Sequence, residues 1–295
     1  RMREEFGTDH RILTCSQELL VSLLGAAVEA KDLPGMADVD SSLLYFCRKV
    51  AERHTVALSG ECADEVFGGY PWFERSELLE ADTFPWCPDL EFRRAVVKPE
   101  LWESLQVEDY VQARYQQSLA EMPALPGEAL WERRRREVGW LSLNWFMSTL
   151  LDRKDRMSMA AGLEVRVPFC DHHLVEYVWN IPWAMKAMNG QRKQVLRDAA
   201  EGLLPEELLR RPKSPYPKTH DPLYEQLVRA RLLTILDDRD APIHSLVDEK
   251  ALRAGLLSDA GDYGKPWFGQ LMAGPQMLAY LIQINEWMSR YHLTV

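Results

Sequence analysis

One junction in the first quarter of the chain restricts its fold more than any other feature. A short apolar run at residues 55–58, TVAL, is typical of a buried strand. Ser59 and Gly60 follow it directly, and a helix begins within the next few residues. Such a strand–turn–helix unit is typical of an open α/β sheet, in which ligands bind at the carboxyl ends of the strands. We therefore expect a binding site at this turn.

The residues on either side of the junction predict the rest of the fold. On its N-terminal side helical and strand patterns alternate, and strands separated by helical segments pair in parallel. After Gly69 the sequence is almost entirely helical. The predicted strands are Ile12–Thr14, Thr55–Leu58 and the extended piece Glu164–Val167; the predicted helices include Met2–Phe6, Gln17–Ala30, Ser41–Glu52, Leu141–Ala161, His172–Asn180, Gln191–Glu201 and Pro275–Tyr291. We predict an α/β fold, a parallel sheet with a large helical C-terminal half.

Charge and cysteine usage exclude several classes of function. The 295 residues carry a formal net charge of −10, so a polyanion such as DNA would be repelled. The one basic run, Arg133–Arg136, lies between Glu132 and Glu137 and is interpreted as a solvated helix face. The five cysteines are never spaced as Cys-x-x-Cys, which argues against a zinc site or a disulfide framework. No apolar run is long enough to cross a bilayer, and we expect a cytoplasmic protein with no membrane partner.

Two acids beside the turn are candidate ligands. Glu61 and Asp64 are three positions apart and would share one face of a helix, where two carboxylates suit Mg²⁺. Backbone N–H groups of the same turn, at Ser59 and Gly60, would attract phosphate. The alternative is that both acids only complement the dipole of the following helix, with Glu61 a surface acid. The residues alone leave these two interpretations open.

Other charged residues have a functional and a structural interpretation as well. Arg192 and Lys193 fall in the first turn of a predicted helix, where a cation opposes the helix dipole, so we expect an anion nearby. The alternative is a surface lysine. Asp152 and Arg156, four positions apart, are interpreted as a surface ion pair, and Asp171 as a helix cap.

Three motifs resemble those of one enzyme family. Residues 59–70 read SGECADEVFGGY, which closely resembles the Ser-Gly-Glu-x-x-Asp-Glu-x-Phe-x-Gly-Tyr motif of class II, glutamine-hydrolysing asparagine synthetases. Residues 155–171, DRMSMAAGLEVRVPFCD, are similar to a second block of that family, and residues 190–197, GQRKQVLR, to a third. The resemblance extends over essentially the whole chain and corresponds to the C-terminal synthetase domain of the family.

The resemblance implies a fold, a reaction and roles for individual residues. The sheet would be of the ATP-pyrophosphatase type. ATP would activate aspartate to β-aspartyl-AMP, and ammonia from glutamine, hydrolysed by an N-terminal glutaminase domain, would displace AMP. Ser59 and Gly60 would border ATP, Glu61 would lie at the reacting centre, and Asp64 would contact the magnesium and pyrophosphate. Lys193, with Arg192 beside it, would face the phosphates; the pocket wall would be built by Asp155, Arg156, Glu164 and Arg166.

The family's phosphate loop, Ser-Gly-Gly-x-Asp-Ser, does not occur in the 295 residues. We therefore interpret residues 1–295 as an incomplete synthetase domain, without the glutaminase domain, and expect it to be inactive alone. Two alternatives stay open: a related amidotransferase acting on another carboxylate, and a non-catalytic remnant that serves as a binding module. A homodimer and a lid or substrate role for the loop Lys213–His220 also stay open.

Overall fold

The computed structural model describes residues 2–187, 190–212, 216, 221–257 and 266–295, so most of the loop 213–220 lies outside the described residues. The elements in chain order are α1 (Met2–Phe6), α2 (Gln17–Ser22), α3 (Leu24–Lys31), α4 (Asp38–Ala51), β1 (Val56–Leu58), α5 (Ala63–Phe67), η1 (Pro71–Phe73), α6 (Ser76–Leu79), α7 (Glu91–Arg94), α8 (Pro99–Leu105), α9 (Val107–Ala120), α10 (Leu130–Leu141), η2 (Ser142–Met147), α11 (Ser148–Met159), β2 (Glu164–Arg166), η3 (Pro168–Cys170), α12 (His172–Trp179), α13 (Trp183–Lys186), α14 (Gln194–Ala199), α15 (Glu206–Leu209), α16 (Pro222–Asp237), η5 (Pro242–Ser245), α17 (Glu249–Ala254) and α18 (Gly274–Tyr291).

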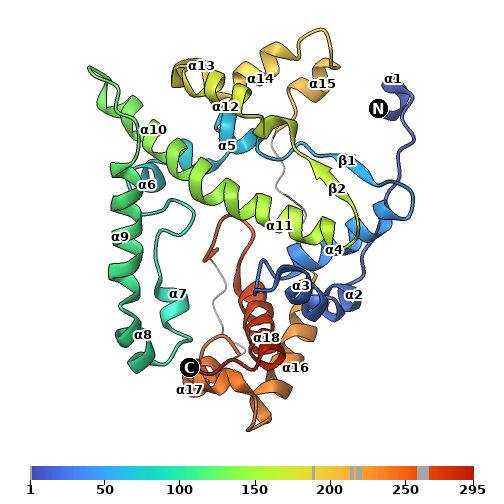
Figure 1. Cartoon of the computed structure of the whole chain (residues 1–295), viewed down its shortest axis with the longest axis vertical. Helices are drawn as coiled ribbons and strands as arrows, with labels where there is room; N and C mark the ends of the chain where they lie inside the picture. The colour runs from blue at the N-terminus through green and yellow to red at the C-terminus, as the bar shows by residue number, and fades with distance from the viewer. Residues whose placement is uncertain (1, 188–189, 213–215, 217–220, 258–265) are drawn as a thin grey trace.

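A long helical rod runs through the middle of the molecule (Figure 1). It consists of α10, the π-helical turn η2 and α11, without a break in the helical backbone between them. The predicted end at Gly162 is confirmed, since this residue takes the left-handed conformation (φ 71°) that favours glycine beyond a helix end. The rod begins earlier than predicted, because Arg133–Arg136 belong to it as well. β2 follows the end of the rod, and the rod also contributes residues to the candidate site.

The sheet is small and parallel. β1 pairs with β2 in the register Val56↔Glu164 to Leu58↔Arg166, so the parallel pairing and the extended piece after Gly162 are confirmed. The strand predicted at Ile12–Thr14 is wrong: these residues pair with no strand, and Ile12 is 81% exposed.

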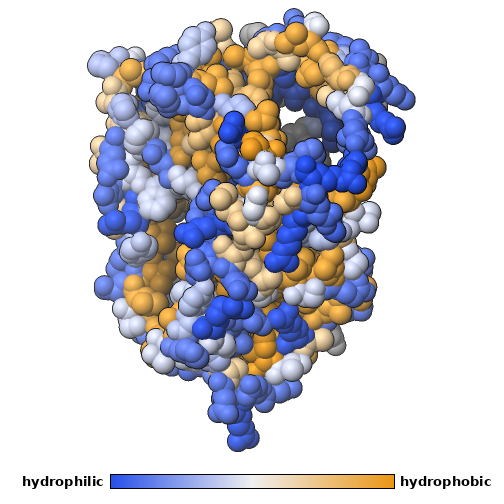
Figure 2. Space-filling model, turned by 45° about the vertical axis from the view of Figure 1, so that its right-hand side comes forward, coloured by the Kyte–Doolittle hydropathy of each residue, from blue (hydrophilic) through white to orange (hydrophobic). Residues whose placement is uncertain are grey.

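The prediction that residues 55–58 are buried is also wrong. Leu58 is 75% exposed, because no described element covers that face of the two-stranded sheet. Figure 2 brings this side forward and shows a hollow in the upper half of the molecule, with hydrophobic surface on one side of it and hydrophilic surface on the other.

The helix predicted over residues 17–30 is divided in two. The backbone N–H of Leu23 bonds back to the carbonyls of Leu19 and Val21 in a turn, and α3 starts at the next residue. The C-terminal helix ends predicted at Glu52, Asn180 and Tyr291 agree with those of α4, α12 and α18 within one residue, whereas α4 begins three residues before the predicted Ser41.

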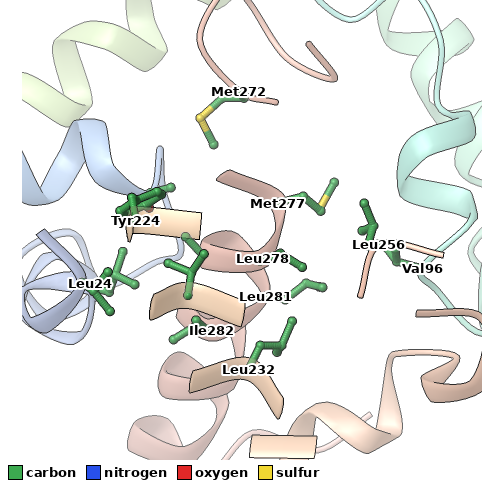
Figure 3. Packing of buried hydrophobic residues seen from close by; sticks show 14 of the residues in the cluster. Leu24, Val96, Tyr224, Leu232, Leu256, Met272, Met277, Leu278, Leu281 and Ile282 are labelled. Atoms are coloured by element: carbon green, nitrogen blue, oxygen red, sulfur yellow. The ribbon is translucent and has the colours of Figure 1, made fainter. Parts of the chain in front are cut away.

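The largest core surrounds α18, which packs between α16 and α3 (Figure 3). Leu278, Leu281 and Ile282 are almost completely buried there against Leu24 and Leu232. This core joins the first helices of the chain to its last one, and it thereby supports α4, which leads into β1.

A second, aromatic core lies under the rod. Trp72 stacks on Tyr70 with ring centroids 4.2 Å apart, and Phe146 of η2 meets both rings edge-on. This core anchors the chain immediately after the turn at residues 59–69. It therefore fixes the position of α5.

The basic run on α10 is only partly a solvated face, which corrects the prediction. Arg133 is largely exposed, but Arg134 donates to Tyr115 Oη, to Glu137 and to the backbone carbonyls of Leu79 and Ala81. Arg136 is mostly buried and pairs with Glu128 at 2.8 Å. A run of four arginines between two glutamates does not reveal which arginine faces the core.

Candidate active site

The turn after β1 begins as an extension of the sheet. The backbone N–H of Ser59 donates to the carbonyl of Arg166 at 2.9 Å, which continues the parallel ladder by one bond. Gly60 lies in open space and is exposed. Cys62 then takes a left-handed conformation (φ 74°), and α5 starts at Ala63. The predicted strand–turn–helix junction is confirmed.

Glu61 does not share a helix face with Asp64, which corrects the prediction. It precedes α5, and the left-handed Cys62 turns the chain between the two acids. Glu61 Oε1 lies 3.4 Å from Arg153 Nη2 and 3.5 Å from Lys154 Nζ, both on α11. Its other carboxylate oxygen is buried and has no hydrogen-bond partner among the described residues. Glu61 is thus a partly buried acid held by two cations, and not the surface acid of the alternative interpretation.

Arg153 is a site residue that the sequence analysis missed. Its side chain is 5% exposed, and besides Glu61 it contacts the sulfur of Met36 at 3.3 Å. It also lowers the pKa of the buried Asp40, although burial has the larger effect and raises that pKa overall. Asp40 accepts a hydrogen bond from the backbone N–H of Met36 at 2.7 Å. Arg153 stands in the charged run Asp152–Arg156, which gives no local signal for its burial.

Asp64 and Lys193 form an ion pair with 2.7 Å between Oδ1 and Nζ. Lys193 does not lie in the first helical turn, which corrects the prediction: α14 begins at Gln194, and Lys193 precedes it with a left-handed backbone (φ 56°). The structure therefore brings together the two residues that the motifs had placed near phosphate. An aspartate from α5 supplies the anion that the lysine was expected to face.

The paired glycines after α5 make room for this ion pair. A side chain at Gly69 would collide with the Asp64 carboxylate and with Lys193 Cε, and one at Gly68 would collide with the ring of Trp183. Gly68 also has a positive φ of 72° and ends α5. The requirement for glycine is steric at residue 69, where Asp64 and Lys193 take the space, and both steric and conformational at residue 68.

Two further buried residues line the turn. Glu65 is 3% exposed and accepts a hydrogen bond from Tyr70 Oη at 2.6 Å. Burial, followed by the Glu65 charge, raises the pKa of Tyr70 far above its usual value. The tyrosine therefore stays protonated and acts as a donor, so this pair ties α5 to the aromatic core.

The remaining charged residues of the motifs lie outside this cluster. Arg192 pairs with Glu74 at 2.7 Å. Glu164 and Arg166 pair with each other on the exposed sheet. Asp155 and Arg156 line a separate hollow between α3, α4 and α11, whose lining does not include Glu61. A pocket-wall role for these four residues stays a prediction.

Two of the structural interpretations are confirmed. Asp152 pairs with Arg156 at 3.5 Å and also lies 3.7 Å from Lys31. The Asp171 carboxylate accepts hydrogen bonds from the backbone N–H groups of His173 and Leu174, so it caps α12 as expected.

Within the described ranges, no three His, Cys, Asp or Glu side chains are grouped so that they could hold a metal ion by themselves. Mg²⁺ needs only one or two protein carboxylates when substrate phosphates complete its shell. Asp64 and the free oxygen of Glu61 fit that requirement in kind. A magnesium role for Asp64 stays a prediction.

Comparison with known proteins agrees with the motifs. The family model described as asparagine synthase matches residues 1–289. This chain belongs to the asparagine synthase family. The chain is 50% identical over all 295 residues to asparagine synthetase [glutamine-hydrolyzing] 3 of Bacillus subtilis, and it covers 48% of that protein.

Other members of the family are more distant. Asparagine synthetase [glutamine-hydrolyzing] 1 of Bacillus subtilis is 30% identical over 62% of this chain and 34% of its own length. The asparagine synthetase of Mesocricetus auratus is 45% identical over 67 residues, which are 22% of this chain and 12% of its own. The chain thus spans about half the length of asparagine synthetase 3 and a smaller share of the other two relatives. Of the helices described here, none has the length and apolarity needed to cross a membrane.

Proposed function

We propose that this chain carries the synthetase reaction of a glutamine-hydrolysing asparagine synthetase, the ATP-dependent conversion of aspartate to asparagine. The observation that supports it most directly is the Asp64–Lys193 pair at the turn after β1, which two separate family-like motifs contribute. The β1–β2 pair would belong to a parallel sheet of the ATP-pyrophosphatase type, and residues 1–295 would form part of one synthetase domain.

The proposed chemistry has two displacement steps. The β-carboxylate of aspartate attacks the α-phosphorus of ATP, and pyrophosphate leaves to give β-aspartyl-AMP. Ammonia released from glutamine then attacks the acyl carbon, loses a proton, and AMP leaves. Charge accumulates on the departing pyrophosphate in the first step, so a fixed cation beside it stabilises the transition state. A bound Mg²⁺ would neutralise part of the same charge.

The ion pairs support the roles that we propose for individual residues. Lys193 pairs with Asp64, and its charge would be available to a phosphate if Asp64 helped to hold a magnesium ion instead. Glu61 is held by Arg153 and Lys154 with one oxygen free, which suits it to orient a substrate group or to take the ammonia proton. Ser59 and Gly60 would border the bound ATP, and Arg192 would lie at the edge of the ATP site.

The test uses the complete gene product that contains these residues. Incubated with aspartate, ATP, Mg²⁺ and glutamine or ammonium, it should release asparagine and pyrophosphate in equal amounts. Residues 1–295 alone should release neither, because they contain no Ser-Gly-Gly-x-Asp-Ser segment to position the pyrophosphate. Mass spectrometry of products from mixed carboxylates would detect a different substrate. Pyrophosphate release that requires another carboxylate, or none in any mixture, would contradict the proposal.

Substitution of Lys193 tests the mapping of the site. Lys193→Ala in the complete gene product should lower asparagine formation by about 10²-fold or more, the usual loss when a charge-stabilising group is removed. Glutamine hydrolysis should continue, since it uses a separate nucleophile. Glutamate would then form with little asparagine, and Lys193→Arg should restore little, because guanidinium is planar and larger. Wild-type rates of pyrophosphate release in Lys193→Ala would remove Lys193 from the site.

A further inference from the structure

A second cavity lies behind α5, on the side of Gly68 and Val66. Its volume is about 360 Å³, within the range of small-molecule sites. α5, α10, α12 and α13 all contribute to its walls. The proposed synthetase reaction uses none of the residues discussed below.

The cavity contains a buried lysine without an acidic partner. Lys186, on α13, is 9% exposed, and no carboxylate of the described residues lies within ion-pair distance of it. Burial, followed by the charge of Arg136, lowers its pKa to about 8. A lysine that is desolvated and faces another cation is stabilised by any anion that reaches it.

The other walls are flat and aromatic. Trp183 stacks on Phe73 with ring centroids 4.9 Å apart, and Trp179 lines the same space. The guanidinium of Arg135 lies 5.7 Å from the Trp183 ring centroid, and its buried Nε has no hydrogen-bond acceptor among the described residues. Because Phe73 and Arg135 lie over the Trp183 ring and Arg136 over the Trp179 ring, the two tryptophans meet a planar apolar ligand with their ring edges.

The acids that line the cavity do not compensate Lys186. Glu128 is paired with Arg136, and Glu65 accepts the hydrogen bond of Tyr70. Glu132 is the third lining acid, and none of the three is among the groups that shift the pKa of Lys186. The cavity therefore combines tryptophan walls with a lysine charge that is left uncompensated.

We propose that this cavity is a binding site for a small aromatic carboxylate, whose ring lies against Trp179 and Trp183 and whose carboxylate pairs with Lys186. The pairing would neutralise a buried charge, and the ring would displace water from the apolar walls. The site is distinct from the Asp64–Lys193 cluster, and it does not depend on the proposed synthetase reaction.

The experiment measures binding of benzoate to the purified protein by calorimetry, without ATP or aspartate. Benzamide, which has the same ring and no charge, is the ligand control. Benzoate should bind at least about tenfold more tightly than benzamide, since a charge-assisted hydrogen bond is lost with the amide. Lys186→Met should weaken benzoate binding by a similar factor, while Lys250→Met, an exposed lysine on α17, should leave it unchanged.

The pH profile separates Lys186 from the other charged groups of the cavity, Glu65, Glu128, Glu132, Arg135 and Arg136. Benzoate binding to the wild type should weaken about tenfold between pH 7 and pH 9 as Lys186 loses its proton. Lys186→Met should lack that dependence and should melt no lower than the wild type. Equal affinity for benzamide, unchanged benzoate binding in Lys186→Met, or no binding up to about 10 mM would overturn the proposal.

Discussion

At the scale of single residues, burial decides how each charge in this protein behaves. Glu61 has two cationic neighbours on α11, and one of them, Arg153, is almost completely buried. Lys186 is equally buried but has only Arg136 as a charged neighbour that shifts its pKa. The two cations stabilise the negative charge of Glu61 inside the fold, whereas burial and Arg136 destabilise the positive charge of Lys186.

Glu61→Gln should therefore affect both activity and stability. The amide cannot balance the charge of Arg153, so we expect a loss of about 1–3 kcal/mol in the free energy of unfolding. In the complete gene product, asparagine formation should fall by about 10²-fold or more, as for the loss of an acid–base group. Urea denaturation and product assays measure the two effects separately.

Glu77→Gln is the matched control, because Glu77 is exposed on α6 and pairs, among the described residues, with Arg75 alone. It should change stability by less than about 0.5 kcal/mol. If Glu61→Gln were as stable as this control, the Arg153 contact would carry no energy. If it also made asparagine at the normal rate, Glu61 would have no part in the reaction.

Lys186 predicts a pH dependence of stability with a defined sign. Its pKa is lowered to about 8 in the folded protein, while the unfolded chain binds the proton up to the ordinary value of about 10.4. Between these two values the unfolded state holds more protons, so the lysine's contribution to stability rises with pH. Below pH 8 the buried charge is a constant cost.

Lys186→Met removes that cost. Near pH 7 the variant should be more stable than the wild type by an amount on the order of 1–3 kcal/mol. The difference should shrink as the pH rises through 8 toward 10. Denaturant titrations of both proteins across this range measure it, and a difference independent of pH would show that Lys186 keeps its ordinary pKa.

At the scale of elements, the α10–η2–α11 rod organises the molecule. Its first part is clamped to the segment after α6 by one arginine, and its last part supplies Arg153 and Lys154 to the site. The rod then ends at Gly162 and passes directly into β2. The position of the site thus depends on how the rod is held along its length.

Two neighbouring arginines of α10 test the clamp. Arg134→Met would leave two backbone carbonyls and Tyr115 Oη without their donor, so we expect a loss of about 2–4 kcal/mol in unfolding free energy. Arg133→Met removes a largely exposed charge paired with Glu137, and it should cost no more than about 0.5 kcal/mol. Equal losses in the two variants would mean that the clamp contributes nothing beyond surface charge.

At the scale of the whole molecule, stability is distributed unevenly. α18 is packed between α16 and α3 in the largest core, and its polar residue Gln283 is also fully buried, where it accepts bonds from the backbone N–H groups of Gly35 and Ala37. The β1–β2 sheet is short and has an exposed face. A hydrogen-bonded backbone amide still exchanges its hydrogen quickly where few buried apolar contacts resist local opening of the structure.

Hydrogen exchange of the chain should follow this distribution. Backbone amides in the middle of α18 should exchange slowest, close to the rate of global unfolding, and those of β1 and β2 should exchange much faster. Mass spectrometry of exchanged peptides resolves the two regions. Slow exchange in β1 equal to that in α18 would show that the sheet belongs to the most stable unit of the fold.

The sequence by itself determined the features that depend on neighbouring residues. The end of the rod at Gly162, the Asp171 cap and the strand–turn–helix junction after residue 58 follow from local hydrogen bonding and backbone preference. The motifs also identified the family, now shown by the comparisons. Helix ends, caps and turns depend on residues that are adjacent in the chain, so a single sequence is enough to predict them.

Only the tertiary structure decided which distant residues meet. Arg153 contacts Glu61 across 92 positions, Lys193 pairs with Asp64, and Arg134 but not Arg133 turns inward. The prediction that residues 55–58 are buried was wrong for the same reason, because the exposure of a strand depends on what covers the sheet and not on the apolarity of the strand. Packing between separate segments selects these contacts, since each residue type is compatible with several partners and only the fold brings one of them within reach.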